Sequence, residues 1–451
     1  MPSVSVHGMG MTPADLPNPV SSLSSSNAGL LRCRTSSVPE NWKLLKAEEV
    51  QKSKLLRGAS ANLAEFIWPQ DERPKVPHDD FQGAEELPII DLGELLQAAV
   101  ADRAATTDHQ HHHQPSSTRR DKIAKDLAKI FSEWGFVQVV NHGVKTEVID
   151  AMQTQAKKFF DLPLEQKEKA KLTQPGGSST NEGFGYGVDS GFFYVGRPWI
   201  DRFQCRWSPV ESITELADKV YTREEAHGID DIDAHAAAEE FRKSMEDYNK
   251  SLDKLTIQIL ELCAEGLGLK SSTFTEPYLG TAGDCIARFN YYPPCPLPSL
   301  TLGLGAHTDP NLLTILHQCS VGGLQICHGH GSWFSVKPSA NSFIINVGDS
   351  FEAWTNGRFK SVKHRAVVNE TQSRLSIVYF SNPLPHSIMS VPHKLIDCEH
   401  PLEFRPAFTW QDYKTHLLET HKNNNNNNNN NDGVRTSKLW LLRRKSILNQ
   451  K

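Results

Sequence analysis

Two histidines, one aspartate and one arginine in the second half of the chain are the residues best suited to chemistry. They are His307, Asp309, His364 and Arg374, with Ser376 two positions after the arginine. Two imidazoles and one carboxylate can hold one face of an octahedral Fe(II) and leave the remaining positions open for other ligands. A guanidinium offers a planar fork that binds a carboxylate. This set therefore predicts an iron site with a carboxylate co-substrate beside it.

The metal-site hypothesis depends on how these three residues are spaced. In an extended strand the side chains alternate, so residues 307 and 309 would share one face. We expect His364 to reach the same ion from a later strand across the barrel. A His-x-Asp pair alone is common by chance. A distant histidine within a β-type run, followed ten residues later by Arg374, makes the pattern much more specific.

The co-substrate hypothesis concerns four residues on two predicted strands. Arg374 and Ser376 share a face, where a guanidinium and a hydroxyl can clamp the distal carboxylate of a dicarboxylic keto acid. Asn290 and Tyr292 are also two positions apart. They are candidates for polar contacts to the same co-substrate, and ordinary packing has equal weight for them.

Short β-type runs separated by Gly, Pro and Asn follow residue 284 and must position these side chains. Strands at this spacing favour a double sheet or barrel of the jelly-roll type, mainly β with flanking helices. The runs are residues 285–292, 313–316, 324–327, 343–347, 366–369 and 375–380.

Helical patterns precede that β-rich region. Apolar spacing predicts helices from Asp121 to a stop at Gly135 and from Lys145 to Phe160, with short strands at residues 87–92 and 137–140. The longest predicted helix spans residues 236–262. Its apolar residues at gaps of four and three indicate an amphipathic helix packed on a sheet, and a dimerising coiled coil is the alternative.

Three polar tracts bound the predicted domains. Residues 1–60 read as a largely disordered extension, residues 103–120 as a His-rich loop insertion, and residues 421–451 as an Asn tract with a basic tail. We expect the fold to finish near Asp412. Between these tracts we expect an N-terminal region at 61–235 and a helix with the β-rich core at 236–420.

Composition excludes several classes of function. The net charge of -5 gives no case for nucleic acid or an anionic membrane. No apolar run reaches the length of a membrane-spanning helix. We expect no secretory signal at the N-terminus, and its Ser-rich sequence with Arg32 and Arg34 leaves an organelle transit peptide as the alternative. The eight cysteines have no CxxC pair or regular spacing, which favours a reducing compartment. We expect a cytoplasmic monomer, and the basic tail makes nuclear import a conceivable alternative.

With these residues in place, the chain resembles the plant Fe(II)- and 2-oxoglutarate-dependent dioxygenases over roughly residues 60–420, and within them most the gibberellin 20-oxidases. The motifs that carry the resemblance are Asn-Tyr-Tyr-Pro-Pro-Cys at 290–295, His-Thr-Asp-Pro at 307–310, Gly-Gly-Leu-Gln at 322–325, Asn-Val-Gly-Asp at 346–349, His-Arg-Ala-Val-Val-Asn at 364–369 and Arg-Leu-Ser at 374–376. Phe-Ile-Trp-Pro at 66–69 and Leu-Thr-Ile-Leu-His-Gln at 313–318 support the narrower resemblance.

The resemblance implies a distorted double-stranded β-helix core flanked by helices. It implies Fe(II) and 2-oxoglutarate as cofactor and co-substrate, O2 as oxidant, ascorbate as reductant, and a small hydrophobic substrate, a gibberellin or related diterpenoid acid. The aromatic, Gly-rich residues 183–193 and 198–207 are then candidates for the substrate lid.

The chain departs from the gibberellin 20-oxidase pattern at two places. Thr308 stands where those enzymes usually carry Cys, and their Leu-Pro-Trp-Lys-Glu segment reads Arg-Pro-Trp-Ile-Asp at 197–201. The missing lysine could pair with a diterpenoid carboxylate, and Arg197 or Arg202 is a candidate replacement. A flavonoid or another hormone is therefore the alternative substrate, and an inactive cupin-like binding protein is the alternative from a different class.

Overall fold

The computed structural model describes most of the chain between residues 63 and 427, plus Leu441. The described ranges are 63–81, 86–95, 116–170, 184–187, 196–206, 211–221, 232–276, 278, 285–329, 331–427 and 441. The predicted extension at 1–60, most of the His-rich segment and nearly all of the basic tail lie outside these ranges. The predictions made for them stay predictions.

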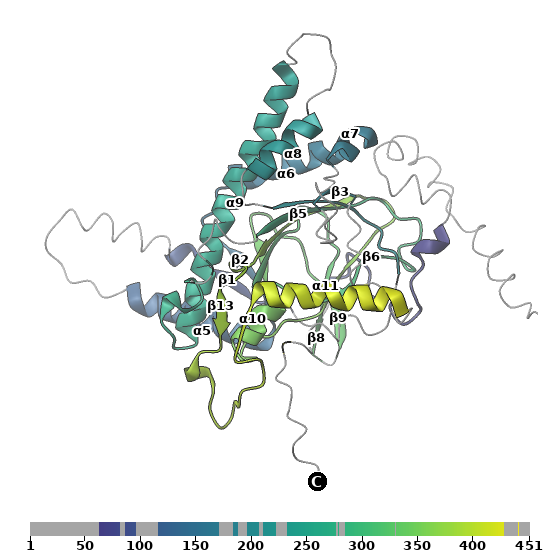
Figure 1. Ribbon diagram of the computed structural model, residues 1–451. Helices are drawn as coiled ribbons and strands as arrows, with labels where there is room; N and C mark the ends of the chain where they lie inside the picture. The colour runs from purple at the N-terminus through teal and green to yellow at the C-terminus, as the bar shows by residue number, and fades with distance from the viewer. Residues whose placement is uncertain are drawn as a thin grey trace, which may run out of the picture.

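Two sheets form the centre of the molecule (Figure 1). The larger sheet has the order β1 (Ile89–Asp91), β2 (Phe136–Val140), β10 (Phe343–Val347), β7 (Leu313–His317), β12 (Arg374–Ser381), β5 (Ile286–Tyr292), β4 (Asp201–Arg206) and β3 (Gly185–Tyr186). The smaller sheet has the order β6 (Leu302–His307), β11 (His364–Val367), β8 (Leu324–His328) and β9 (Ser332–Ser335). A third, two-stranded sheet joins β13 (Ile388–Ser390) to β14 (Ala407–Thr409).

Apolar side chains from both principal sheets meet between them. Phe136, Leu316 and Val378 of the larger sheet pack in one cluster with Leu324 and Ile326 of the smaller sheet. Sheets that bury a shared apolar layer form a sandwich or jelly roll. The predicted jelly-roll core with flanking helices is thereby confirmed.

The strand predictions are right for several apolar runs and miss strands elsewhere. The run at 343–347 matches β10 residue for residue. β6, with Gly303 and Gly305, and β9 were not predicted. Residues 201–206, expected in the substrate lid, are instead β4, which pairs with β5 inside the larger sheet. The remaining lid residues are described only at 184–187 and 198–200, so the rest of that prediction stays untested.

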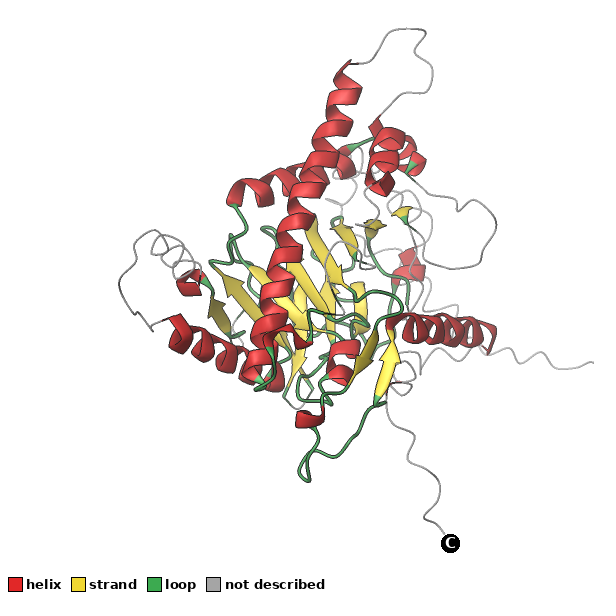
Figure 2. Ribbon diagram, turned by 60° about the vertical axis from the view of Figure 1, so that its left-hand side comes forward, coloured by secondary structure: helices red, strands yellow, loops and turns green. Residues whose placement is uncertain are grey.

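Helices cover one side of the larger sheet (Figure 2). The α-helices are α5 (Ser116–Glu133), α6 (Thr146–Asp161), α7 (Leu164–Lys169), α8 (Glu211–Tyr221), α9 (Ile232–Gly266), α10 (Asp349–Trp354) and α11 (Trp410–Asn427). Short 3-10 turns are η1 (Leu63–Phe66), η2 (Ser271–Thr273) and η4 (His393–Leu395). Among the described residues, no helix is both long and apolar enough to cross a bilayer.

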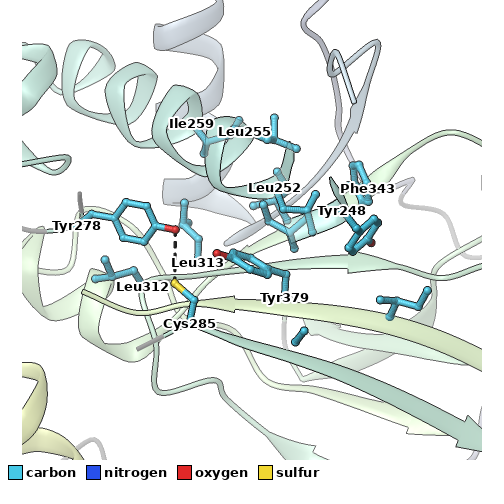
Figure 3. Close-up of a cluster of buried hydrophobic side chains, with 14 of the residues drawn as sticks. Tyr248, Leu252, Leu255, Ile259, Tyr278, Cys285, Leu312, Leu313, Phe343 and Tyr379 are labelled. Carbon is cyan, nitrogen blue, oxygen red and sulfur yellow. Dashed lines mark hydrogen bonds between the residues drawn. The ribbon is translucent and has the colours of Figure 1, made fainter. Parts of the chain in front are cut away.

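The longest helix, α9, lies across the larger sheet and contacts α5, α6 and α8. Its apolar stripe is buried in the main hydrophobic cluster, where Tyr248 lies beside Phe343 and Leu252, Leu255 and Ile259 follow along the helix (Figure 3). The stripe is therefore satisfied within one chain, as the amphipathic reading predicted. The coiled-coil alternative is wrong for this helix.

The predicted helix stop at Gly135 is confirmed by its backbone. Gly135 has φ +65, a left-handed conformation that favours glycine after a helix end. A Cβ at this position would lie 2.1 Å from the carbonyl oxygen of Lys360. The start of the same helix corrects the loop prediction at 103–120, because residues 116–120 already belong to α5.

The end of the fold lies beyond the predicted limit at Asp412. α11 runs to Asn427, into the Asn tract, and its Tyr413 and Leu417 are buried in the main cluster. Leu441 is fully buried in the same cluster, and its carbonyl oxygen accepts a hydrogen bond from the amide of Arg405 at 2.8 Å. Leu441 of the predicted tail thus belongs to the core, because its apolar side chain packs there.

Candidate iron and 2-oxoglutarate site

The three candidate metal ligands come from the smaller sheet and the loop after it. His307 is the last residue of β6 and His364 the first residue of β11, and the two residues are register partners in antiparallel strands. Asp309 lies in the loop that follows β6. The predicted convergence is correct, but its two reasons are not. Asp309 is not on a strand, and His364 comes from the neighbouring strand rather than from across the barrel.

The distances within this triad suit one metal ion. The Nε2 atoms of His307 and His364 each lie 3.6 Å from an oxygen of Asp309. Potential ligand atoms of all three residues lie within 4.8 Å of one another. Each imidazole Nδ1 faces a backbone carbonyl, that of Gly305 at 2.8 Å or Val362 at 3.2 Å. A carbonyl only accepts, so Nδ1 carries the proton and Nε2 presents its lone pair toward the aspartate.

Two side chains from the larger sheet fix the Asp309 carboxylate. Its Oδ2 accepts hydrogen bonds from Thr314 Oγ1 at 2.7 Å and from Asn346 Nδ2 at 2.9 Å. Burial alone would raise the pKa of Asp309. The adjacent His364 and His307, together with these two hydrogen bonds, lower it below the usual value. Thr314 and Asn346 were not predicted as site residues, although both lie on runs that were predicted as strands.

The electrostatics of the triad favour ligand-competent protonation states. Burial, and then the neighbouring His364, lower the pKa of the His307 imidazole well below its ordinary value. His307 is therefore neutral and Asp309 ionised at neutral pH. A divalent cation needs those forms, because a protonated imidazole has no lone pair to donate.

The four candidate co-substrate residues form two cross-strand pairs on the larger sheet. Arg374 of β12 is opposite Tyr292 of β5, and Ser376 is opposite Asn290. The Arg374 guanidinium lies 5.0 Å from the centre of the Tyr292 ring. Its buried Nε has no hydrogen-bond partner among the described residues. A buried cationic donor without a partner fits a site for an anionic ligand.

All seven predicted site residues line one cavity between the two sheets, which we call the inter-sheet cavity. They are Asn290, Tyr292, His307, Asp309, His364, Arg374 and Ser376. Further lining residues include the apolar Phe136, Leu304 and Leu324. Glycines make room for two of the seven. A Cβ at Gly303 would lie 2.6 Å from the Tyr292 ring, and one at Gly323 would lie 2.9 Å from Arg374 Cδ.

The two arginines considered as substitutes for the missing lysine do not line the inter-sheet cavity. Arg197 is half-exposed, pairs with Glu65 at 2.5 Å and stacks on Phe66. Arg202 is buried in β4 and donates to Asn290 Oδ1 at 3.3 Å. Arg202 therefore contacts Asn290, which lines the cavity, but does not line the cavity itself.

A different arginine, Arg288, does line the cavity. It lies on β5 two residues before Asn290, so strand alternation could have identified it. Its Nε donates to Gln204 Oε1 at 2.8 Å, and its guanidinium lies 4.6 Å from the centre of the Phe380 ring. These contacts hold a further cation in the same cavity as Arg374. Arg365 also lines this cavity, and its Nε donates to Gln325 Oε1 at 2.9 Å.

Two family models match the chain. Residues 283–383 match the 2OG-Fe(II) oxygenase superfamily, and residues 87–219 match the non-haem dioxygenase in morphine synthesis N-terminal model. The first range contains every residue of the triad and all four co-substrate candidates. The second covers β1 to β4, α5 to α7 and most of α8.

Known proteins resemble the chain over most of its length. Gibberellin 20 oxidase 1-A of Triticum aestivum is 34% identical over 79% of this chain and 87% of its own length. Naringenin,2-oxoglutarate 3-dioxygenase of Callistephus chinensis is 33% identical over 78% of this chain and 86% of its own. A crystal structure of JOX2 in complex with 2OG, Fe and JA superposes with a TM-score of 0.60 at 28% identity, covering 82% of this chain and 97% of that one. The chain therefore belongs to the 2OG-Fe(II) oxygenase superfamily and is a 2-oxoglutarate-dependent dioxygenase that uses Fe(II).

Proposed function

We propose that His307, Asp309 and His364 hold Fe(II), and that Arg374 with Ser376 holds the distal carboxylate of 2-oxoglutarate. The observation that carries this proposal is that the triad and the buried guanidinium line one cavity from opposite sheets. Bound Fe(II) and 2-oxoglutarate supply the activation of O2 that oxidises the substrate.

The residues of this chain contribute orientation, charge and exclusion of water. Thr314 and Asn346 hold the Asp309 carboxylate in place. Tyr292 and Asn290 lie directly opposite the guanidinium and the hydroxyl that would hold the co-substrate, so we assign them contacts to it. Apolar residues of both sheets, among them Phe136, Leu304 and Leu324, also line the cavity, which suits a site that must exclude water from a reactive centre.

For the substrate we propose a small hydrophobic carboxylic acid, a gibberellin or a related diterpenoid acid. Arg288 supports this choice, since it places a cation in the inter-sheet cavity in addition to Arg374. A guanidinium held by Gln204 and Phe380 is preorganised to pair with a carboxylate. The similarity to gibberellin 20 oxidase 1-A points to the same class.

A flavonoid is the second candidate substrate, because the naringenin dioxygenase is nearly as similar to this chain. Turnover distinguishes the candidates. Purified protein would be incubated with Fe(II), ascorbate as reductant and 2-oxoglutarate, and then with gibberellin precursors, ent-kaurenoic acid or naringenin. Succinate and oxidised products would be measured by mass spectrometry. Absence of succinate under every condition would contradict catalysis and favour a cupin-like binding protein.

Arg288 allows a sharper test of acid recognition. We expect Arg288→Gln to lower kcat/KM for the acid substrate by roughly tenfold or more, since a charge-assisted contact is worth about 1.5–3 kcal/mol. Arg288→Lys should retain part of the activity. The wild type should prefer the free acid to its methyl ester, and Arg288→Gln should lose that preference. An unchanged preference in the variant would exclude Arg288 as the anchor.

We also propose that the protein is a cytoplasmic monomer acting on small molecules, not on nucleic acid or membranes. The seven cysteines among the described residues are free thiols, which suits a reducing compartment. Light scattering after size-exclusion chromatography would test the oligomeric state. A fluorescent fusion, compared with one whose basic tail is neutralised, would distinguish cytoplasmic from nuclear localisation.

A further inference from the structure

The loop that carries Asp309 is fixed by the first turn of α10. The amides of Gly348 and Asp349 donate to the carbonyls of Leu312 at 2.8 Å and Asp309 at 2.7 Å. Ser350 adds its amide and hydroxyl to the next carbonyl, that of Pro310. Amides at a helix start have no partner within the helix, so they need an external acceptor. Here the metal loop provides those acceptors.

Gly348 shows how closely the two segments approach. A Cβ at this position would lie 2.1 Å from the carbonyl oxygen of Asn311. No larger residue fits there without moving the backbone of the metal loop. The loop and α10 therefore form one packed unit.

Hydrogen bonds between side chains connect the metal loop and α10 to α11. Thr308 Oγ1 donates to Asp349 Oδ2 at 3.1 Å, and the hydroxyl of Tyr413 donates to the same oxygen at 3.3 Å. All three residues are buried. Thr308 lies between two metal-ligand candidates, Asp349 begins α10, and Tyr413 belongs to α11. One carboxylate oxygen thus joins the metal loop to a helix about 100 residues later in the sequence.

We propose that Thr308 is a positioning residue that connects the metal loop, residues 308–312, to α11 through Asp349. The packing position of α11 then determines the affinity of the site for Fe(II). The inference rests on the proposed metal site at His307, Asp309 and His364. It concerns Thr308 and Tyr413, and neither residue is one of those three ligands.

The physical reason is that Asp309 lies outside the sheet. His307 and His364 are held by strand pairing, whereas Asp309 depends on its loop. Loss of the Thr308 or Tyr413 hydroxyl would leave Asp349 with one donor fewer and loosen the loop. Removing groups that orient metal ligands typically lowers metal affinity by about 10–100-fold. We therefore expect a loss on the order of tenfold although all three ligands remain.

Metal affinity can be measured without turnover, with Mn(II) as the probe. Anaerobic titrations followed by electron paramagnetic resonance would compare the wild type with Thr308→Val, Thr308→Ser and Tyr413→Phe. Thr308→Val and Tyr413→Phe should each weaken Mn(II) binding, and Thr308→Ser should bind as the wild type does. The Thr308→Val/Tyr413→Phe double variant should lose less than the two single losses combined, since both hydroxyls act through one oxygen.

Two matched controls separate this effect from a general loss of stability. Tyr278, which Figure 3 shows in the buried cluster, donates its hydroxyl to a carboxylate oxygen of Asp253 at 2.9 Å. Tyr278→Phe therefore removes the same kind of bond away from the metal loop. Thr355, which follows the last residue of α10, donates to the carbonyl of Phe351 at the end of that helix away from the Asp309 loop. Tyr278→Phe and Thr355→Val should lower thermal stability and leave Mn(II) affinity unchanged.

Each outcome decides the matter. Equal Mn(II) affinity in the wild type, Thr308→Val and Tyr413→Phe would overturn the inference and leave the metal site intact. If Thr308→Val does not fold, Tyr413→Phe and Thr308→Ser still decide it. A wild-type protein that binds no Mn(II), with His307→Ala unchanged from it, would instead refute the proposed metal site and the inference together.

Discussion

Two of the arginines that line the inter-sheet cavity, Arg374 and Arg288, differ in the contacts that hold them, and that difference separates their proposed roles. Arg374 stacks on Tyr292, which is also a lining residue, and its Nε is buried without a partner among the described residues. Arg288 is oriented by Gln204 and stacks on Phe380. We therefore assign the co-substrate to Arg374, and the substrate to Arg288.

For Arg374 we predict a change in the KM for 2-oxoglutarate. Arg374→Ala should raise the KM for 2-oxoglutarate by on the order of tenfold to a hundredfold, because it removes charged hydrogen bonds worth about 1.5–3 kcal/mol. Arg374→Lys should recover only part of this, since an ammonium lacks the planar fork. Mn(II) affinity should stay as in the wild type. A KM unaltered in Arg374→Ala would show that another residue clamps the co-substrate.

The triad allows the complementary prediction. His307→Ala should lose metal binding and 2-oxoglutarate turnover together, because two remaining ligands cannot hold the ion in a fixed geometry. Calorimetric titration with Mn(II) and a succinate assay would measure the two losses. Retained metal binding with lost turnover would mean that His307 serves another purpose than ligation.

Residue types at the site were readable from the sequence, but their geometry was not. The alternation argument correctly grouped Asn290 with Tyr292 and Arg374 with Ser376, since β5 and β12 are regular strands. The same argument failed at Asp309, where the strand ends at His307. Tertiary contacts with α10 shape that loop, and they come from residues about 40 positions away.

At the scale of elements, the junction after α5 positions one of the metal-ligand candidates. The carbonyl of Gly135 accepts from the amide of Val347, and the carbonyl of Phe131 accepts from the amide of Lys360. Residue 360 belongs to the segment that leads into β11 and His364. The end of α5 thus fixes the approach to that strand.

Substitution of Gly135 tests this junction. Gly135→Ala forces a non-glycine residue to φ +65 and places its Cβ 2.1 Å from the Lys360 carbonyl. We expect a loss of about 2–4 kcal/mol in the free energy of unfolding, from the left-handed backbone and the overpacking together. Urea denaturation would measure the loss.

Gly268 supplies the matched control. It has φ +71, but a Cβ there would meet nothing within 4 Å. Gly268→Ala should therefore cost only the backbone term, about 1–2 kcal/mol. Equal losses for the two variants would mean that the close approach to Lys360 is accommodated without cost.

At the scale of the whole molecule, pairing between strands far apart in the sequence determines which segments become strands, and local sequence could not indicate this. β6 contains two glycines and becomes a strand only because β11 pairs with it. β4 reads as an aromatic loop, yet it pairs with β5 along its whole length. Local propensity was sufficient for α9 and β10, whose apolar patterns are regular, whereas strands defined by their partners were missed or misplaced.

The whole fold also contains buried histidines that make its stability depend on pH. His317 ends β7, and Phe343 separates it from His142. Burial lowers the pKa of His317 to about 4, with His142 lowering it further and Asp150 opposing the shift. Burial also lowers the pKa of His142. Both side chains are neutral in the folded protein at neutral pH.

The direction of the pH effect follows from this neutral state. An unfolded histidine has a pKa of about 6.5, so the unfolded chain binds more protons than the folded one between about pH 6.5 and 4. The stabilising contribution of His317 is therefore complete above about pH 6.5 and is lost as the pH falls toward 4. At about 1.4 kcal/mol per pKa unit, the loss for this residue is about 3 kcal/mol.

Urea denaturation of metal-free protein at a series of pH values would measure this loss. His317→Gln removes the titrating group, so its free energy of unfolding should fall by about 3 kcal/mol less than that of the wild type from about pH 7 to 4. His386, which is exposed, provides the control, and His386→Gln should follow the wild type. Parallel curves for the wild type and His317→Gln would mean that His317 is protonated without unfolding, and that acid lability arises at other groups.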